Sequence, residues 1–323
     1  MSASLGERDT QDPGIPLSST LERSDTLIFM NPPEAWSFLR KRLHILRDSR
    51  RIIGIWFWET ESIPEDWIKV SRLFDEVWVA SHWSKLVFEP VLHCPVKVFP
   101  VPVDAFGHCH GSEARSFAGV PISAEKYIFL NVFDYRSSFE RKNPLACIRA
   151  FKRAFPKSQI SAQLLIKTLN AATAPDKHVL LLDEAAERED IVIRDMELTS
   201  TEMDAIYRRA DCFLSLHRSE GLGMGFLQSV ASGKSAIITD YSAPAEFSDL
   251  PRVYPVRYAF TSITADIPSY QDCQGTWAEA DVEHAAGLIQ QVVEAGRTPA
   301  LAGDFGRHTV ASFGQFIQNE LMA

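Results

Sequence analysis

The sequence predicts an α/β protein with two Rossmann-like, doubly wound parallel-sheet domains. Short apolar runs alternate with segments of helical periodicity from residue 26 to about residue 300. Such alternation, with short connections, is typical of parallel sheets that helices cover on both faces. The run 51–58 is almost continuously apolar, as a strand buried on both faces should be. A stretch rich in Gly, Ser and His at 105–125 divides the alternation into two parts and is predicted to be a linker.

Composition limits the class of protein. With 323 residues and 46% hydrophobic content, the chain can form one large core or two modest ones. The net charge of −9 argues against a nucleic-acid partner, because phosphate backbones are bound by basic surfaces. No apolar run approaches the roughly 20 residues that a membrane helix requires. Residues 1–25 are polar and rich in Ser, Asp, Glu and Pro, and we expect them to form a disordered leader.

Cysteine usage favours a cytoplasmic protein without a metal site. The five cysteines are scattered and odd in number, which is typical of reduced thiols. The pair His93-Cys94 and the His-Cys-His run at 108–110 both lack the close-set cysteine pair that many zinc sites use. We therefore expect neither a metal nor a cofactor.

Residues 26–104 are predicted to form the first domain. Its elements follow from the spacing of apolar residues, from Pro33 near the start of the first helix and from Ser81 as a helix cap. Strands are expected at 26–30, 51–58, 76–80 and 96–100, and helices at 33–46, 65–73 and 81–88.

Residues 126–300 are predicted to form the second domain, of the same type. Pro144 suits the first turn of a helix, and Thr199-Ser-Thr-Glu202 is a capping box. Strands are expected at 127–132, 164–167, 191–194, 212–216 and 236–239, and helices at 144–155, 177–188, 199–210, 226–233 and 281–295. A last helix is expected within 301–323.

The candidate site lies where the strand at 212–216 meets the helix that ends before Gly233. Between them stand a polar cluster, His217 to Glu220, and a turn with three glycines at 221, 223 and 225. A strand, a glycine turn and a helix together present bare N–H groups and a positive helix end to an anionic ligand. Ligands of open α/β sheets also bind at the carboxyl ends of strands. The alternative is an ordinary turn whose glycines serve only its conformation.

Several stretches carry a resemblance to a known family. They are Ser219-Glu220-Gly-Leu-Gly, Gln228, Ala231-Ser-Gly233, the run Ser235 to Asp240, the Arg-x5-Lys pattern of Arg136 and Lys142, and Arg-Lys-Asn-Pro at 141–144. Together they resemble family-four retaining glycosyltransferases of the GT-B fold. The runs 53–59, 74–81 and 98–104 are similar to a bacterial, group 1 branch of that family.

The resemblance implies roles for individual residues. Glu220 would lie by the donor sugar, while Lys142 and Arg136 would clamp the donor diphosphate as the other catalytic groups; Arg141 is the alternative phosphate ligand. The implied donor-binding set comprises Arg141, His217, Gly221, Gly223, Met224, Gly225 and Gln228. Gln228 departs from the family, which has a second Glu there for the ribose; Gln keeps an acceptor oxygen but loses the charge. Glu59 and Ser81 are implied on the acceptor side.

The implied activity is transfer of a hexose from a nucleotide diphosphate sugar to a glycan or lipid-linked glycan, with retention and without a metal. Such a protein would serve polysaccharide biosynthesis in the cytoplasm or at the inner face of the membrane, with peripheral membrane contact. The resemblance also implies that the terminal helix crosses back onto the first domain.

One departure keeps other functions open. The family's first domain begins with a strand, a glycine-rich turn and a helix, whereas residues 1–25 contain only Gly6 and Gly14 in polar surroundings. The resemblance therefore implies a GT-B-like protein whose first, acceptor-side Rossmann-like domain (26–104) is incomplete. A non-catalytic nucleotide-sugar-binding relative or subunit is therefore the main alternative. A GT-B-fold epimerase or phosphorylase is a further one.

Overall fold

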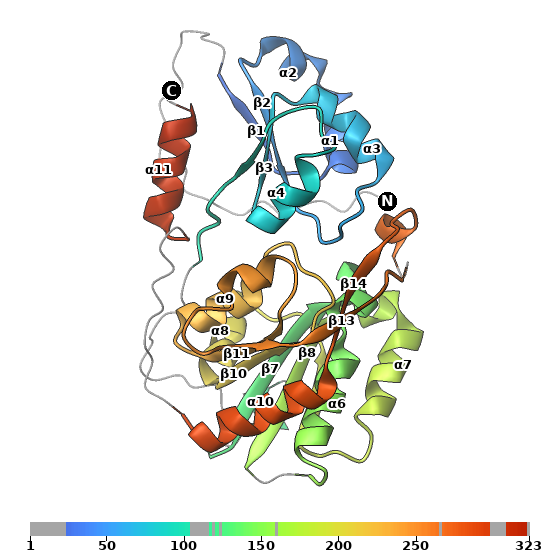
Figure 1. The fold of residues 1–323 in the computed structure, drawn as a ribbon, viewed down its shortest axis with the longest axis vertical. Helices are drawn as coiled ribbons and strands as arrows, with labels where there is room; N and C mark the ends of the chain where they lie inside the picture. The colour runs from blue at the N-terminus through green and yellow to red at the C-terminus, as the bar shows by residue number, and fades with distance from the viewer. Residues whose placement is uncertain are drawn as a thin grey trace.

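Two parallel sheets lie one above the other along the long axis of the molecule (Figure 1). The structure, a computed structural model, describes residues 24–103, 116–117, 120–122, 125–158, 161–264, 267–297 and 308–321. Most of the leader predicted at 1–25 lies outside these residues, as does most of the linker predicted at 105–125. Within that linker the structure shows two short antiparallel strands, β5 (Ser116–Phe117) and β6 (Val120–Pro121).

The first sheet has four parallel strands in chain order, β1-β2-β3-β4. The strands are β1 (Thr26–Ile28), β2 (Ile52–Trp56), β3 (Glu76–Val79) and β4 (Val96–Val98). The helices between them are α1 (Pro32–Leu39), α2 (Leu43–Asp48), α3 (Glu65–Val70) and α4 (His82–Phe88). Residues of α1, α3 and α4 share one apolar cluster with Trp56, Val77 and Val79 of the sheet.

The single helix expected at 33–46 is two helices, α1 and α2. The chain turns at Arg40–Arg42, where the amide of Arg42 donates to the carbonyl of Leu39. The apolar spacing continues through this turn, so periodicity alone could not reveal the break. Leu39 is buried as a result, whereas Leu43 is exposed.

The second sheet has six parallel strands in the order β12-β11-β10-β7-β8-β9. Its strands are β7 (Tyr127–Asp134), β8 (Ala162–Leu169), β9 (Ile191–Asp195), β10 (Cys212–Ser215), β11 (Ser235–Thr239) and β12 (Val253–Val256). One face packs on α6 (Pro144–Ala154), α7 (Pro175–Glu184) and α10 (Val282–Ala295). The other face packs on α8 (Ser200–Arg209) and α9 (Met224–Ala231). Because the strand order reverses between β7 and β10, a crevice is expected at their carboxyl ends.

An antiparallel arm links the second domain to the first. It consists of β13 (Tyr258–Ser262), β14 (Thr276–Ala280) and a one-turn helix, η5 (Pro268–Tyr270), between them. The ring of Tyr270 lies 5.5 Å from that of Trp58 at the end of the first sheet. The sequence showed no clear pattern between residue 252 and the helix predicted at 281–295, so this arm was not predicted.

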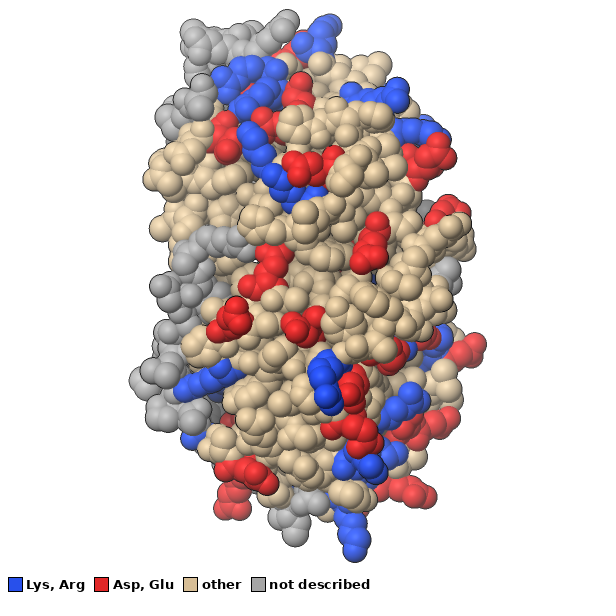
Figure 2. Space-filling view, in the orientation of Figure 1, with Lys and Arg blue, Asp and Glu red and all other residues tan. Residues whose placement is uncertain are grey.

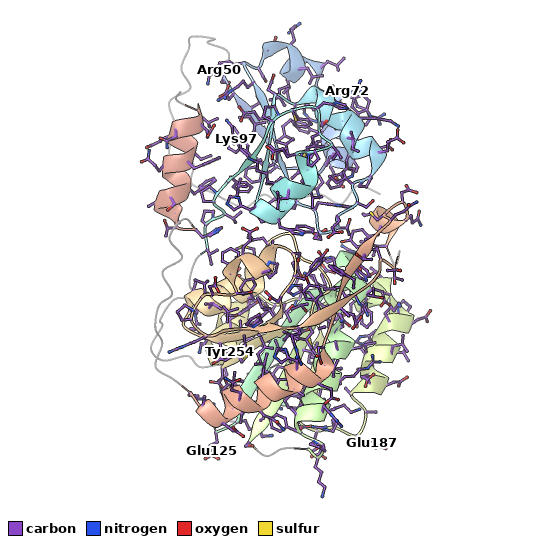
Figure 3. The ribbon with its side chains drawn as sticks, in the orientation of Figure 1. Arg50, Arg72, Lys97, Glu125, Glu187 and Tyr254 are labelled. Atoms are coloured by element: carbon purple, nitrogen blue, oxygen red, sulfur yellow. The ribbon has the colours of Figure 1, made fainter. Side chains whose placement is uncertain are left out.

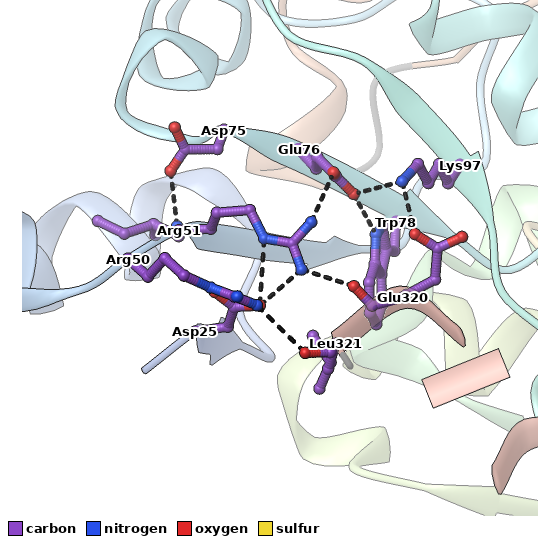
Figure 4. A network of polar contacts seen from close by, with 10 residues as sticks. Asp25, Arg50, Arg51, Asp75, Glu76, Trp78, Lys97, Glu320 and Leu321 are labelled. Atoms are coloured by element: carbon purple, nitrogen blue, oxygen red, sulfur yellow. Dashed lines mark hydrogen bonds and ion pairs between the residues drawn. The ribbon is translucent and has the colours of Figure 1, made fainter. Parts of the chain in front are cut away.

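Helix α11 (Val310–Leu321) lies against the first sheet although it ends the described chain (Figure 1). The ring of Phe316 packs 4.9 Å from that of Trp78. At the carboxyl end of α11, Arg51 donates to the carbonyl of Glu320 at 2.6 Å and Arg50 donates to that of Leu321 at 3.1 Å (Figure 4). Cations stabilise this end because the last carbonyls of a helix lack partners within it.

The same arginines hold the start of the described chain. Arg50 and Arg51 both pair with Asp25, at 2.8 and 2.6 Å, and hold its pKa well below the ordinary value (Figure 4). Asp25, assigned to the leader from sequence, therefore belongs to this network. No helix in the described ranges is both long and apolar enough to cross a membrane.

Candidate functional site

Two loops meet at the carboxyl ends of β7 and β10, where the strand order of the second sheet reverses. The loop after β7 leads through Arg136 into a short helix, α5 (Phe139–Lys142). The loop after β10 contains His217 and Glu220 and leads into α9. Topology thus brings together two segments that lie 78 residues apart in the chain.

Arg141 is the buried centre of this meeting point, with only 3% of its side chain exposed. Its guanidinium donates to the carbonyls of Ser219 and Ser137, both at 2.9 Å, and pairs with Glu220 at 3.0 Å. Burial opposes the charge, yet the neighbouring Tyr270, Glu220 and Glu59 raise the pKa of Arg141 above its ordinary value. The guanidinium therefore remains charged and ties the two loops together.

Glu220 pairs with both neighbouring cations, Arg141 and Lys142. Burial alone would raise its pKa, but attraction to Lys142 and Arg141 lowers it to about 2. Burial lowers the pKa of Lys142, and the pairing with Glu220 opposes this shift. The amide of Glu220 also donates to the hydroxyl of Ser242 at 2.9 Å, which fixes the backbone at this point.

His217 is a neutral imidazole within the same site. Only 1% of the residue is exposed, and burial lowers its pKa to about 4. Its Nδ1 lies 3.2 Å from the hydroxyl of Ser215. At neutral pH it can therefore orient a hydrogen bond without adding charge.

The glycine turn is constrained by its surroundings as well as by any ligand. Gly223 has φ +87°, in the left-handed region that favours glycine. A Cβ at Gly221 would lie 2.7 Å from the carbonyl oxygen of Trp58. A Cβ at Gly225 would lie 2.9 Å from both Phe213 and Tyr207. Packing thus requires small residues here, and the same absence of side chains leaves the first turn of α9 accessible.

A cavity of about 320 Å³ opens beside these groups. It is lined by Phe57, Glu59, Val132, Lys142, Tyr207, Phe213, Ser215, His217, Glu220, Gly221, Leu222, Gly223, Met224, Gly225, Phe226 and Pro244. Eight residues singled out from the sequence share this cavity. Phe57 and Glu59 come from the first domain, so the site is formed by both domains.

Other residues singled out from the sequence lie elsewhere. Arg136 is exposed and lines a neighbouring cavity of about 360 Å³, together with Glu59, Arg141 and Tyr270. Gln228, one turn into α9, is not among the residues that line either cavity. Of the two candidate phosphate ligands, Arg141 therefore contacts Glu220, whereas Arg136 lines the neighbouring cavity.

Ser81 contacts the backbone of the glycine turn. Its hydroxyl accepts from the amide of Ser84 at 3.1 Å and so caps α4. The same hydroxyl donates to the carbonyl of Gly221 at 3.0 Å. A residue of the first domain therefore holds the loop that carries Glu220.

Two contributors to the site, Ser242 and Tyr270, were not found from the sequence. Ser242, at φ 59°, accepts from the amide of Glu220, and Tyr270 donates to Glu59 at 3.1 Å. Arg218, within the polar cluster, pairs instead with Glu279 at 2.7 Å and Glu140 at 3.1 Å. The one available signal was that Ser242 lies in the loop that follows β11 and Asp240. Within the described ranges, no group of three His, Cys, Asp or Glu side chains is placed to hold a metal ion.

Comparison with known proteins identifies the fold. No family model matches the sequence, and no curated protein matches it either. Solved structures of GT-B glycosyltransferases do match, so the predicted two-sheet, GT-B-like α/β fold is confirmed.

Three of these structures illustrate the likeness. The α,α-trehalose 6-phosphate synthase of Burkholderia multivorans aligns over 94% of this chain and 71% of its own, with 14% identity and a TM-score of 0.65. Anabaena HepE, solved with UDP and glucose, aligns over 91% and 73%, with 13% identity and a TM-score of 0.61. The sucrose-phosphate synthase of Thermosynechococcus elongatus aligns over 92% and 68%, with 15% identity and a TM-score of 0.58. At these identities the likeness shows the fold and no more.

Proposed function

We propose that the protein transfers a hexose from a nucleotide diphosphate sugar to a hydroxyl group of a glycan or lipid-linked glycan, with retention of configuration. The observation that carries this proposal is the meeting of Lys142, Arg141 and Glu220 at the strand-order reversal, beside the first turn of α9. Fixed cations and N–H donors are what a departing nucleoside diphosphate requires, because they stabilise the charge that develops on it.

The ion pairs of the free site suggest how the donor is received. Lys142 borders the cavity but is paired with Glu220. A diphosphate entering the cavity would compete for Lys142 and for the N–H groups at the start of α9. The carboxylate of Glu220 would then be free to accept hydrogen bonds from sugar hydroxyls. Arg141 would stay in place, because carbonyls of both loops also hold it.

The acceptor would bind on the side of the site that the first domain forms. Glu59 borders both cavities and lies 3.8 Å from Arg141, so an acceptor in the cavity beside Arg136 would approach the same centre. HepE was solved with UDP and glucose, which makes UDP-glucose the first donor to test.

A second candidate function is nucleotide-sugar binding without transfer. Two observations favour it: Gln228 stands where the family that the sequence resembles has Glu and lies outside the cavity lining, and the described residues give the first sheet four strands. Binding of a nucleotide without any transfer would distinguish this function from the first.

The experiment is calorimetry of the purified protein with UDP, GDP and ADP, followed by a transfer assay with the matching nucleotide sugar. We expect one nucleotide to bind and Lys142→Ala to weaken that binding by at least tenfold, because a charge-assisted contact to phosphate is lost. Lys152→Ala, on α6 of the same domain, is the matched control and should bind as the unaltered protein does.

Glu220→Gln separates binding from chemistry. Because Glu220 neutralises Lys142 in the free site, this variant should bind the nucleotide at least as tightly as the unaltered protein. Transfer should fall by roughly 100-fold or more, as expected when a group that stabilises developing charge is removed. Failure of a folded protein to bind any of the three nucleotides would rule out both candidate functions.

A further inference from the structure

One segment of this acidic protein is strongly basic. Residues 36–51 contain six Lys or Arg residues and one acidic residue, although the whole chain has a net charge of −9. The segment comprises the second half of α1, the turn after it, all of α2 and the residues that lead into β2. Figure 2 shows Lys and Arg side chains gathered at this end of the molecule.

Half of these cations have structural partners. Arg50 and Arg51 hold Asp25 and the end of α11, and Arg47 pairs with Asp48 at 2.6 Å. The other three, Arg40, Lys41 and Arg42, are exposed at the turn between α1 and α2. No ion pair to any of these three occurs within the described part of the chain, although Arg42 lies 4.3 Å from the ring centroid of Phe38.

Large apolar side chains stand beside the exposed cations. Trp36 is 48% exposed and precedes Arg40 by four residues, so both lie on the same face of the helix. Leu43, directly after the three cations, is 64% exposed. Exposed Trp and Leu among basic residues are typical of surfaces that lie in a membrane interface.

An apolar groove joins this surface to the candidate site. The groove, about 630 Å³, is lined by Pro32, Pro33, Trp36, Asp66, Trp67, Lys69, Val70, Arg72 and Leu73. Pro33, Asp66 and Trp67 also line the cavity that contains Glu59 and Arg141. Arg72 is exposed at the rim of the groove, at the same end of the molecule as Arg50 (Figure 3).

We propose that the surface formed by Trp36, Arg40–Leu43 and Arg72 docks on an anionic membrane. An anionic membrane complements this surface, because the cations attract acidic lipid headgroups while Trp36 and Leu43 enter the membrane–water interface. The rest of this acidic protein is repelled by such a membrane, so docking is confined to this face. The proposal does not depend on glycosyl transfer. If transfer occurs, an acceptor carried by the same membrane would meet the groove that leads to Glu59.

The test is co-sedimentation of the full chain with vesicles. One set contains phosphatidylcholine with about a third phosphatidylglycerol, and the other contains phosphatidylcholine alone. We expect binding to the first set only, weakening as salt is raised, because surface charges are screened. Replacing Arg40, Lys41 and Arg42 together by Ser should lower the partition coefficient roughly 100-fold. Trp36→Ser combined with Leu43→Ser should lower it by at least tenfold.

The matched control removes three cations from the other domain. Arg149, Lys152 and Arg153 of α6 replaced together by Ser should leave vesicle binding unchanged. Calorimetry with the bound nucleotide should be the same for all variants, which separates this test from that of the proposed function. The proposal is overturned if the folded protein does not bind anionic vesicles, if the Arg40–Arg42 variant binds them fully, or if the α6 variant loses as much binding.

Discussion

The loops at the carboxyl ends of the two sheets contribute differently to the candidate site. In the first sheet, neighbouring strands follow one another in chain order. In the second sheet, β8 and β9 lie on one side of β7, whereas β10, β11 and β12 lie on its other side, so the strand order reverses between β7 and β10. At the reversal, two loops leave neighbouring strands and Arg141, Lys142 and Glu220 meet. The described strands of the first sheet show no such reversal. Residues after their carboxyl ends line or support the site instead: Glu59 after β2 borders the cavity, and Ser81 after β3 holds the glycine turn.

This difference indicates that the strand order determines at which sheet edge the charged side chains of two loops can meet. Ligands of open α/β sheets bind where strand order reverses, because the loops there separate and leave a crevice. The same type of βα unit is present in both domains, and both contain carboxylates paired with two cations. In the second domain, the cation Arg141 is itself buried, with 3% of its side chain exposed, whereas Arg51 of the first domain is 26% exposed. Three predictions test how far the two sheets differ.

The largest effect is expected at the buried cation of the second sheet. Arg141→Ala would leave Glu220 and two carbonyls without their shared donor, so the free energy of unfolding should fall by about 3–5 kcal/mol. Urea titration followed by circular dichroism measures this loss. Arg42→Ala, at an exposed cation of the first domain, should change stability by less than about 0.5 kcal/mol. Equal effects of the two variants would remove the contrast between the domains.

A second effect is expected at acid pH. The pKa of His217 in the folded protein is about 4, below its ordinary 6.5, so as pH falls the unfolded chain takes up a proton first. Stability should therefore fall between pH 6.5 and pH 4, by on the order of 3 kcal/mol from this residue alone. His217→Gln should make urea midpoints less sensitive to pH across this window.

His82, in the first domain, provides the comparison for that measurement. It is exposed at the first position of α4. His82→Gln should leave the acid slope of the unmodified protein unchanged. A slope that persists in His217→Gln would mean that another group causes the acid sensitivity.

The smallest effect tests the contact between the domains. Ser81→Ala removes the cap of α4 and the bond to the carbonyl of Gly221, which should cost about 1–2 kcal/mol of stability. It should also weaken nucleotide binding several-fold, because the loop that carries Glu220 loses a support. Thr199→Ala removes a comparable cap from α8 and should lower stability without changing nucleotide affinity. Unchanged affinity in Ser81→Ala would show that the first sheet does not position the loop.

Local patterns in the sequence identified most elements of both sheets. The cap of α4 at Ser81, the capping box at Thr199 and the first-turn Pro144 of α6 all lie where they were predicted. Predictions of this kind succeed because the atoms involved are a few residues apart. The predictions that missed concern the break at Arg40–Arg42 and the arm of β13 and β14. Apolar spacing continues through the break, and the arm depends on a contact with the distant Trp58.

By itself, the sequence determined the α/β class and the strand, glycine turn and helix around Glu220, since spacing and backbone preference are local properties. Only the tertiary structure decided which cation meets Glu220. Arg136 and Arg141 are equally plausible in the sequence, but Arg141 is buried beside Glu220 and Arg136 is exposed in the neighbouring cavity. Which arginine contacts Glu220 depends on two loops that the strand order brings together, and no pattern within either loop predicts it.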